Sequence, residues 1–289
     1  MLSLVGILLI LGMVFGGFIA AGGKISVVLH ALPHEMIIIG GATLGSFMIA
    51  NKTKVIKGCG KDLRRCFKGE KWLKDDYKDL LCLLFILTKT MKTKGLLALE
   101  AQLENPNEST IFTTFPRILH DHMAISFICD TLRMMTMSLE DAYQVEDAMQ
   151  RQLDKHHHEA IAPAQALQVV ADSLPAIGIV AAVLGVIKTM SSIDQPPEIL
   201  GHMIGGALVG TFLGVFLAYC FIGPMASKIN TSHEQDVHFY YIIRDVLVSH
   251  LKGNAPQISI EIGRGNIPTI YQPSFMELEV VLNQLTMPG

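Results

Sequence analysis

The sequence ADSLPAIGIVAAVLGVIKTM spans Ala171 to Met190 and is apolar, with a proline near its start. Five compact residues within it recur at intervals of three and four, which places them on one face of an α-helix: Pro175, Gly178, Ala182, Gly185 and Thr189. Such a face lets another helix approach closely or leaves room for a water-filled path, and both arrangements are common in membranes. The stretch therefore predicts a membrane helix that lines a helix contact or a path.

Pro175 adds a second feature to this predicted helix. A proline inside a helix cannot donate a hydrogen bond to the carbonyl group four residues earlier, here that of Ala171, and its ring clashes with that group. We therefore expect a bend with a free carbonyl acceptor, which suits a moving part. The alternative is that proline and glycine are simply frequent in membrane helices and serve only packing here.

The composition of the chain is that of a membrane protein with a sizeable water-exposed part. Of its 289 residues, 50% are hydrophobic and only 17% are charged, whereas soluble domains carry about 25% charged residues. The net charge of -3 does not indicate a nucleic-acid partner. The five cysteines are an odd number without CxxC spacing, which argues against a disulfide framework and a zinc ribbon and favours reduced thiols.

Four nearly uncharged stretches are candidate membrane spans, at about 2–21, 34–51, 170–191 and 201–224. Short loops join the first to the second and the third to the fourth, which predicts two helical hairpins. We expect the second helix to start near Pro33, with Glu35 at the water boundary. In the fourth stretch, a glycine ridge favours close packing of another helix: Gly206, Gly210 and Gly214.

Basic residues determine the predicted orientation. Nine lysines and arginines lie between Lys52 and Lys74, where the second stretch ends, whereas the loop between Ser191 and Gly201 has none. By the positive-inside rule, the long segment after the second stretch and both termini are expected in the cytoplasm. The basic cluster is also expected to contact anionic membrane lipid.

The predicted fold is therefore an all-α integral membrane protein with four transmembrane helices in two hairpins, a large helical cytoplasmic loop and a helical cytoplasmic C-terminal tail. The predicted parts are an outer hairpin at 1–51, the cytoplasmic domain at 52–168, a pore-lining hairpin at 169–224 and the tail at 225–289.

Within the predicted cytoplasmic parts, apolar periodicity and breakers predict helices at 96–103, from Pro116 past Arg133, at 139–153 and at 227–251. The last of these is expected to continue the fourth span into water. Ser274 and Glu277 form a capping box that starts a terminal helix. The adjacent His156, His157 and His158 would point in different directions on a helix, so they make a poor metal site.

None of the four predicted spans has an acidic residue near its middle. A proton relay through lipid usually needs one, yet Glu35, Asp172 and Lys188 are all expected near the ends of their helices. Asp172 has two equally good interpretations. Its side chain either reaches the water at the membrane boundary without a further role or serves as a functional group. If the chain forms a channel, we expect a partner helix to supply the proton-binding carboxylate.

Five sequence motifs, taken in order, resemble the motility protein A family, the larger subunit of the bacterial flagellar stator: LENPNES (Leu103 to Ser109), FPRIL (Phe115 to Leu119), DSLPAIGIVAAVLGV (Asp172 to Val186), LVGTFLGVFLAY (Leu208 to Tyr219) followed by Pro224, and PSFMELE (Pro273 to Glu279). The resemblance covers nearly the whole chain. It implies a homo-oligomer in the cell inner membrane, a pentamer around two copies of motility protein B, whose aspartate takes up the proton that drives rotation.

The resemblance also implies roles for single residues. Pro175 and Pro224 match the prolines that couple proton passage to movement. Glu100 matches the acidic member of a charged pair that engages the rotor switch protein, and Lys92 stands where relatives often carry arginine, whose planar fork it lacks. Ala182 stands where sodium-driven relatives tend to carry threonine.

The predicted ion is therefore the proton. A methyl group at position 182 offers no oxygen ligand to a dehydrated sodium ion. Thr211 is shared by both kinds of relative and does not discriminate between them. The predicted ion-path and coupling residues are Pro175, Gly178, Ala182, Thr189, Thr211 and Pro224.

Two alternatives stay open on the sequence. A Tol/Exb-like energising complex shares the arrangement of small-faced helices around a partner, although such proteins usually have three spans. A membrane scaffold without transport would explain the glycine ridges and the basic cluster but leaves Pro175 and Pro224 without a role. No nucleophile, base or metal constellation is visible, so neither an enzyme nor a cofactor other than the transported proton is expected.

Overall fold

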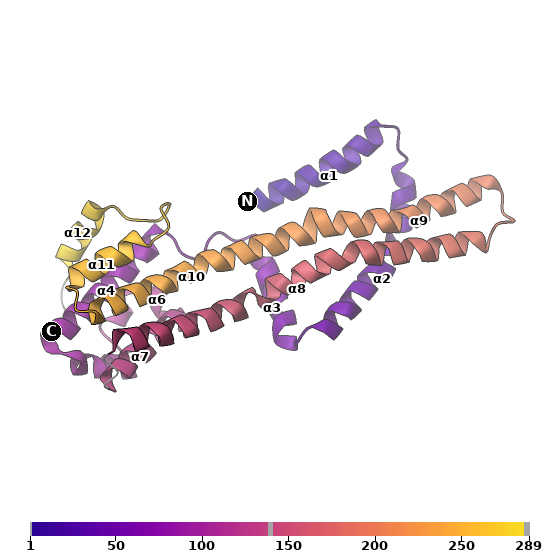
Figure 1. Ribbon diagram of the computed structural model, residues 1–289. Helices are drawn as coiled ribbons and strands as arrows, with labels where there is room; N and C mark the ends of the chain where they lie inside the picture. The colour runs from indigo at the N-terminus through magenta and orange to yellow at the C-terminus, as the bar shows by residue number, and fades with distance from the viewer. Residues whose placement is uncertain (1, 138–140, 286–289) are drawn as a thin grey trace. The chain divides into compact units, whose positions relative to one another are not determined.

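The computed structural model describes residues 2–137 and 141–285, and over these residues it is helical with no β-strand. Figure 1 shows the order of the helices along the chain. They form two compact units, one made of residues 1–69 and 160–232 and the other of residues 70–159 and 233–289. The predicted all-helical class is therefore confirmed.

The first unit holds the apolar helices. They are α1 (Leu2–Ala20), α2 (Ile25–Ala50), the short basic α3 (Thr53–Arg65), the C-terminal part of α8 (Ala142–Met190), α9 (Pro197–Leu217), a π-helical turn (Ala218–Ile222) and the start of α10 (Gly223–Leu251). Among the described residues, four helices are long and apolar enough to cross a membrane, which agrees with the four predicted stretches. The last of them runs from Pro197 to Leu251. The expectation that the final span continues as a helix to Leu251 is confirmed.

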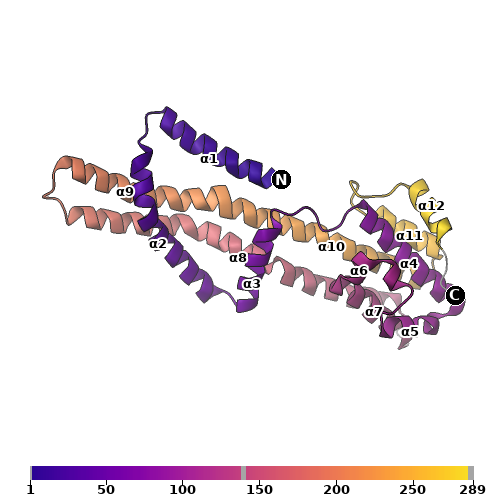
Figure 2. The same cartoon turned by 180° about the vertical axis from the view of Figure 1, so that it is seen from behind.

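Two features of the first unit position its helices. Figures 1 and 2 both show α2 crossing the hairpin of α8 and α9. Where they meet, a small apolar core is buried: Ile39, Leu174, Ala181, Leu213 and Ala218. In addition, the Lys228 ammonium donates to the Ser3 hydroxyl over 2.6 Å and to the Cys66 carbonyl over 2.8 Å, and so joins the starts of α1 and α10 to the end of α3.

The prediction for the start of α2 is wrong. The helix begins at Ile25 and contains Pro33 in its interior, so Glu35 lies inside a 26-residue helix and not at its boundary. The stretch from Ile25 to His34 carries no acidic or basic residue apart from histidine, which makes it apolar enough to extend the helix.

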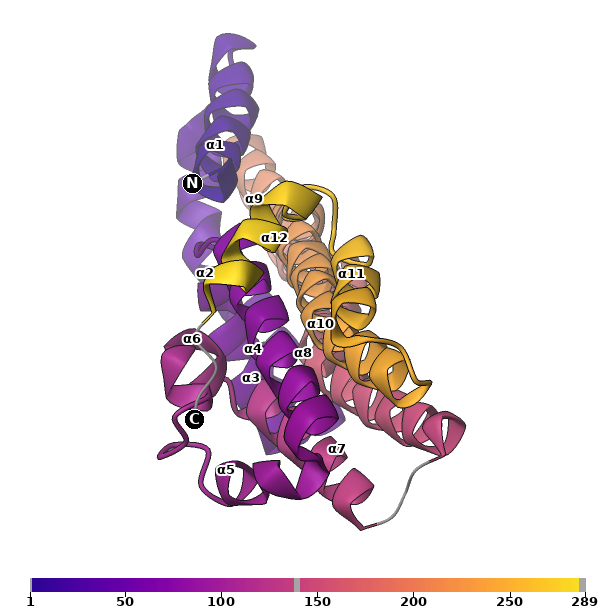
Figure 3. The ribbon, with the colours of Figure 1, turned by 90° about the vertical axis from the view of Figure 1, so that its left-hand side faces the viewer.

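The second unit packs around α4 (Lys74–Lys94), as Figure 3 shows, with α11 (Pro256–Gly265) and α12 (Phe275–Gln284) beside it. Its helices also include η1 (Leu96–Leu99), α5 (Glu100–Glu104), η2 (Phe112–Thr114), α6 (Pro116–Leu119), α7 (His122–Thr136) and the adjoining parts of α8 and α10. The Trp72 ring stacks on Phe239 with 3.8 Å between the ring centroids. Residues 72–153 and 237–278 thus share one apolar core.

Three details of this unit differ from the expected helices. The stretch 96–103 is a 3₁₀ turn followed by α5, and the helix expected from Pro116 past Arg133 is broken between α6 and α7. The break is explained by Asp121, whose carboxylate accepts from the Ala124 amide over 2.8 Å and caps α7. The helix expected at 139–153 is the start of α8, although Leu139 itself lies outside the described residues.

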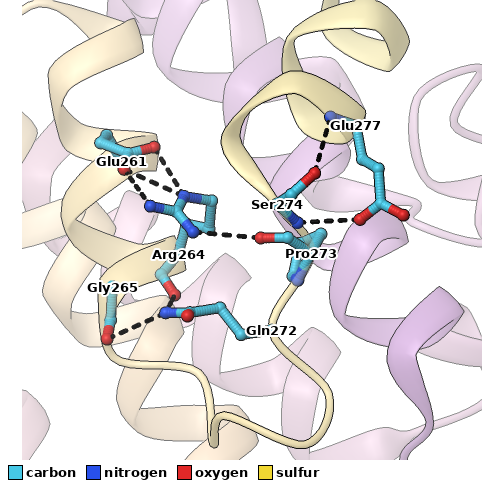
Figure 4. A network of polar contacts seen from close by, with 7 residues as sticks. All are labelled: Glu261, Arg264, Gly265, Gln272, Pro273, Ser274 and Glu277. Atoms are coloured by element: carbon cyan, nitrogen blue, oxygen red, sulfur yellow. Dashed lines mark hydrogen bonds and ion pairs between the residues drawn. The ribbon is translucent and has the colours of Figure 1, made fainter.

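The C-terminal segment is held by polar contacts that Figure 4 draws. The predicted capping box is confirmed: the Ser274 hydroxyl accepts from the Glu277 amide, and the Glu277 carboxylate accepts from the Ser274 amide. Arg264 binds Glu261 and donates to the Pro273 carbonyl over 3.0 Å, which fastens the loop before α12 to α11.

Candidate functional site

The hairpin of α8 and α9 is the centre of the candidate site, because the two backbones approach each other closely. A methyl group added at Gly178 would lie 2.9 Å from the carbonyl oxygen of Gly210, and one at Gly185 would lie 2.7 Å from the Cβ of Ala207. One at Gly214 would lie 2.7 Å from the carbonyl oxygen of Leu174. The glycines of α8 and α9 therefore face each other within one chain, as small residues do at membrane helix contacts.

The other predicted ion-path residues lie beside this contact. Ala182 and Thr211 are half-buried, and the backbone nitrogen of Ala182 would come within 3.2 Å of a methyl group added at Gly210. Thr189 is buried and donates its hydroxyl to the Gly185 carbonyl over 2.9 Å, within its own helix. The structure thus brings Ala182 next to the residue before Thr211, whereas the Thr189 hydroxyl already has an acceptor.

The two prolines occupy different settings. Pro175 is half-buried inside α8, which continues through it. Pro224 is exposed and lies two residues after the π-helical turn Ala218–Ile222, with Gly223 between them. A proline lacks the amide that the regular helical ladder needs, and a π-turn is one way to pass it without ending the helix. Such turns occur frequently at functional sites.

Glu35 lies further inside its helix than the sequence predicts. Its side chain is only 7% exposed, and its Oε2 atom has no hydrogen-bond partner among the described residues. This oxygen would lie 2.6 Å from a methyl group at Gly210, so the carboxyl rests against the glycine of α9. An acidic group is therefore buried at the α8–α9 contact. The apolar stretch before Pro33 was the sequence signal for it, because it allows the helix to start earlier.

A cavity of about 440 Å³ lies beside Glu35, between α2, the end of α8 and the start of α9. It is lined by polar groups together with small apolar residues. The polar and ionisable lining residues besides Glu35 are Ser26, His30, His34, Lys188, Thr189 and His202. The cavity is polar enough to hold water molecules.

The predicted rotor-facing residues lie in the second unit. Lys92 is exposed in the last turn of α4, and Glu100 is exposed at the first position of α5. Between them, Gly95 has a φ of 82°, in the left-handed region that glycine adopts without strain, and it ends α4. Both charged side chains are therefore available to a partner surface, one on each side of this turn.

The histidine run has an ordinary structural setting. His156 is half-buried with its ring edge-on to Tyr240, at a centroid distance of 5.5 Å. Burial, and secondarily the positive charge of Lys71, lowers the pKa of His156 below its ordinary value. Within the described residues, no cluster of three or more histidine, cysteine or acidic side chains is placed to hold a metal ion.

Burial accounts for the state of two cysteines in the second unit. It raises the pKa of Cys82 to about 12 and that of Cys129 to about 11. At neutral pH both side chains are therefore neutral thiols in an apolar core, which makes them poor nucleophiles and poor metal ligands.

Comparison with known proteins finds relatives that match this chain over its whole length. Residues 4–95 match the family model "Motility protein A N-terminal", and residues 120–241 match the MotA/TolQ/ExbB proton channel family. The chain is 41% identical to Motility protein A of Salmonella typhimurium, with 100% of this chain and 97% of the relative covered. It is 33% identical to Chemotaxis protein LafT of Vibrio parahaemolyticus, with 96% and 97% covered.

Solved structures agree. The chain matches one chain of the flagellar MotAB stator complex of Bacillus subtilis with a TM-score of 0.68 and 26% identity, covering 96% of this chain and 98% of that one. A chain of C. jejuni MotAB has the same fold, with a TM-score of 0.72, 21% identity, and 92% and 95% covered. The relatives that match over the full length are named Motility protein A or Chemotaxis protein LafT. The chain therefore belongs to the motility protein A family of flagellar stator proteins.

Proposed function

We propose that this chain, a stator subunit of the motility protein A family, conducts protons together with motility protein B and converts their flow into rotation of the flagellar rotor. The observation that carries the proposal is the glycine-lined contact of α8 and α9, with Ala182 and Thr211 half-buried beside it. A contact of this kind lets small backbone shifts change the width of a neighbouring path.

The partner and the oligomer are supported by the surface of the apolar helices. The solved Bacillus subtilis relative is part of a MotAB complex. In this chain α1 has no buried residue, and α8 exposes large apolar side chains, among them Ile179, Val183 and Val186. Exposed apolar area of this extent requires lipid or other protein around it. In the proposed assembly, five copies and membrane lipid cover these faces, and motility protein B stands inside the ring.

In the proposed mechanism, the proton binds an acidic residue of motility protein B near Ala182 and Thr211. Each elementary charge that crosses the membrane brings about 2.3 kcal/mol per 100 mV, which is enough to bias a helix bend or a step of a ring. Pro175 and Pro224 provide the positions in α8 and after α9 at which such a movement is least costly. No metal or organic cofactor takes part in this proposal.

The proposed topology places the chain in the inner membrane with both termini in the cytoplasm. The basic residues from Lys52 to Lys74 support a cytoplasmic location for the segment that follows the second span. The second unit would then be cytoplasmic, where the exposed Lys92 and Glu100 contact the rotor switch protein through charge.

Swimming of a strain that lacks the gene for this chain tests the proposal. We expect the strain to assemble flagella and not rotate them, and the unaltered gene to restore swimming. The Pro175→Leu variant should co-purify with motility protein B from membranes yet fail to restore rotation, because a leucine supplies the backbone N–H that proline lacks and so removes the helix irregularity expected there. Normal swimming of the deletion strain would contradict the stator role, and full torque in the assembled Pro175→Leu variant would contradict the role of Pro175.

A further inference from the structure

The buried carboxyl of Glu35 has no role in the mechanism proposed above. It lies on α2, outside the predicted ion-path residues, and it is more than nine-tenths buried. Burying an ionised carboxylate is costly unless the charge is paired and hydrogen-bonded. Since Oε2 lacks a hydrogen-bond partner among the described residues, burial without a proton is unfavourable, and binding a proton would relieve the cost.

The cavity beside Glu35 has polar and apolar walls. The lining residues of α2 form two neighbouring rows at four-residue intervals, with Ser26, His30 and His34 in the polar row and Val27, Ala31 and Glu35 in the other. The same cavity reaches Lys188 near the end of α8, beside the loop that joins α8 to α9. Glu35 therefore lines a cavity that also reaches residues close to that connecting loop.

Contact with Gly210 places the carboxyl next to the predicted ion path. The Glu35 Oε2 atom and the backbone nitrogen of Ala182 both lie close to the position that a Cβ on Gly210 would occupy, at 2.6 Å and 3.2 Å. A larger residue at position 210 would displace the carboxyl. Gly210 therefore leaves room for Glu35 beside Ala182 and immediately before Thr211.

We propose that Glu35 is a proton-binding site of this chain, which takes up a proton from the cavity and releases it toward the acidic residue of the partner. The inference rests on the proposed function, because it adds a site to the same proton path. The step is balanced: the carboxylate gains a proton and forms one O–H bond, and the same bond breaks when the proton leaves.

The groups that face this site come from three helices. His30 and His34 line the cavity from α2, Lys188 from α8 and His202 from α9. An imidazole ring can accept a proton on one nitrogen and give one up from the other, which suits proton transfer by His34 and His202. The Nδ1 of His30, in contrast, is engaged by the Ser26 carbonyl oxygen at 2.9 Å. Lys188 adds a positive charge to the lining of the same cavity.

A structural role is the competing explanation, and substitution by an isosteric amide separates the two. The Glu35→Gln side chain keeps the shape and the contact with Gly210 but cannot ionise, whereas Glu35→Asp keeps an ionisable group on a shorter side chain. Glu198→Gln is the matched control, because Glu198 is exposed in the first turn of α9 and does not line the cavity.

The first test measures swimming speed against external pH in the deletion strain that carries each variant. We expect Glu35→Gln to lose most of its speed, Glu35→Asp to retain part of it with a shifted pH profile, and Glu198→Gln to match the unaltered protein. The amount of motility protein B that co-purifies from membranes should be equal in all four cases. Unaltered speed and pH profile in Glu35→Gln would overturn the proposal.

The second test needs no substitution. Dicyclohexylcarbodiimide is an apolar reagent that reacts with protonated carboxyl groups, and mass spectrometry of peptides from the labelled, unaltered complex locates the product. We expect labelling of Glu35 that increases as the pH falls, with no such labelling of the exposed Glu198. Absence of label on Glu35 would refute the inference even if Glu35→Gln failed to assemble. If the unaltered gene did not restore swimming, the stator role would fail instead.

Discussion

Gly214 shows how the absence of one carbon atom determines the distance between α8 and α9. Its Cα faces Gly178 across the contact, where a methyl group would lie 2.8 Å from the Gly178 Cα and 2.7 Å from the Leu174 carbonyl oxygen. No flexible side-chain end is involved, so the backbones themselves would have to separate. Gly201 in the same helix has no atom within 4 Å of the corresponding position.

The Gly214→Ala variant should therefore be destabilised, whereas Gly201→Ala should not. Overpacking of a close contact costs about 1–3 kcal/mol. We expect a lower midpoint of thermal unfolding for the purified complex with Gly214→Ala and reduced swimming of the cells. An unchanged midpoint in Gly214→Ala, measured beside Gly201→Ala, would show that α8 and α9 do not pack in this way.

His156 makes the stability of the second unit depend on pH. Burial lowers its pKa in the folded chain below the ordinary value of 6.5, so the unfolded chain binds more protons in the interval between the two values. The contribution of the neutral, buried ring is fully present above pH 6.5 and decreases as the pH falls toward the lower, folded value.

Substitution of His156 by glutamine should flatten this part of the stability profile. Hydrogen exchange of the amides in α4 and α10, followed as the pH is lowered below 6.5, measures it after correction for the intrinsic exchange rate. His158, which is exposed on the same helix, serves as the control in His158→Gln. Equal profiles for the unaltered chain and His156→Gln would contradict the assignment.

Lys92 and Glu100 are both exposed near the turn that ends α4. Gly95 ends α4 with a positive φ, and Lys92 and Glu100 therefore stand exposed on either side of it. Exposed surface charges contribute little to stability, so reversal of either charge should leave the fold intact. A charged surface that meets a partner is sensitive to such a reversal.

We expect Lys92→Glu and Glu100→Lys to reduce torque without lowering the amount of stator in the membrane. Lys92→Arg keeps the charge and should retain or increase torque. Glu279→Lys reverses an exposed acidic charge on α12 and is the matched control. Rotation rates of tethered cells measure the effect, and equal rates for Lys92→Glu and Glu279→Lys would exclude the charge contact proposed for Lys92.

The choice of ion belongs to the assembled molecule, since the proposed path lies between this chain and its partner. Ala182 is half-buried beside Gly210 and offers only a methyl group, and the Thr189 hydroxyl is engaged by the Gly185 carbonyl. Position 182 on α8 therefore provides no side-chain oxygen for a dehydrated sodium ion. The proton requires only a carboxyl group.

Swimming speed should consequently follow the protonmotive force and ignore external sodium. Replacing sodium by potassium at constant pH and membrane potential should leave the speed unchanged, while an uncoupler that dissipates the proton gradient should stop the cells. A speed that rises with sodium at constant protonmotive force would contradict proton drive.

Several features of the structure could be predicted from the local sequence pattern alone. Uncharged stretches predicted four apolar helices, and the Ser274 and Glu277 spacing predicted the capping box, because both depend on neighbouring residues in the chain. The glycine spacing in 171–190 and 201–224 predicted a close helix approach on one face. The sequence could not indicate which helix makes that approach, since a small face fits a partner chain as well as the same chain.

Only the tertiary structure decided where the acidic groups stand. The sequence determined that this is a helical chain with four apolar segments, because hydrophobicity and helical periodicity are properties of consecutive residues. It placed Glu35 at a water boundary, since a proline two residues earlier resembles a helix start. In the fold, α2 continues through Pro33 and crosses α9 at Gly210, so the carboxyl is buried at the α8–α9 contact. Whether a charged residue faces water or a neighbouring helix depends on contacts between segments far apart in the chain, which local periodicity does not contain.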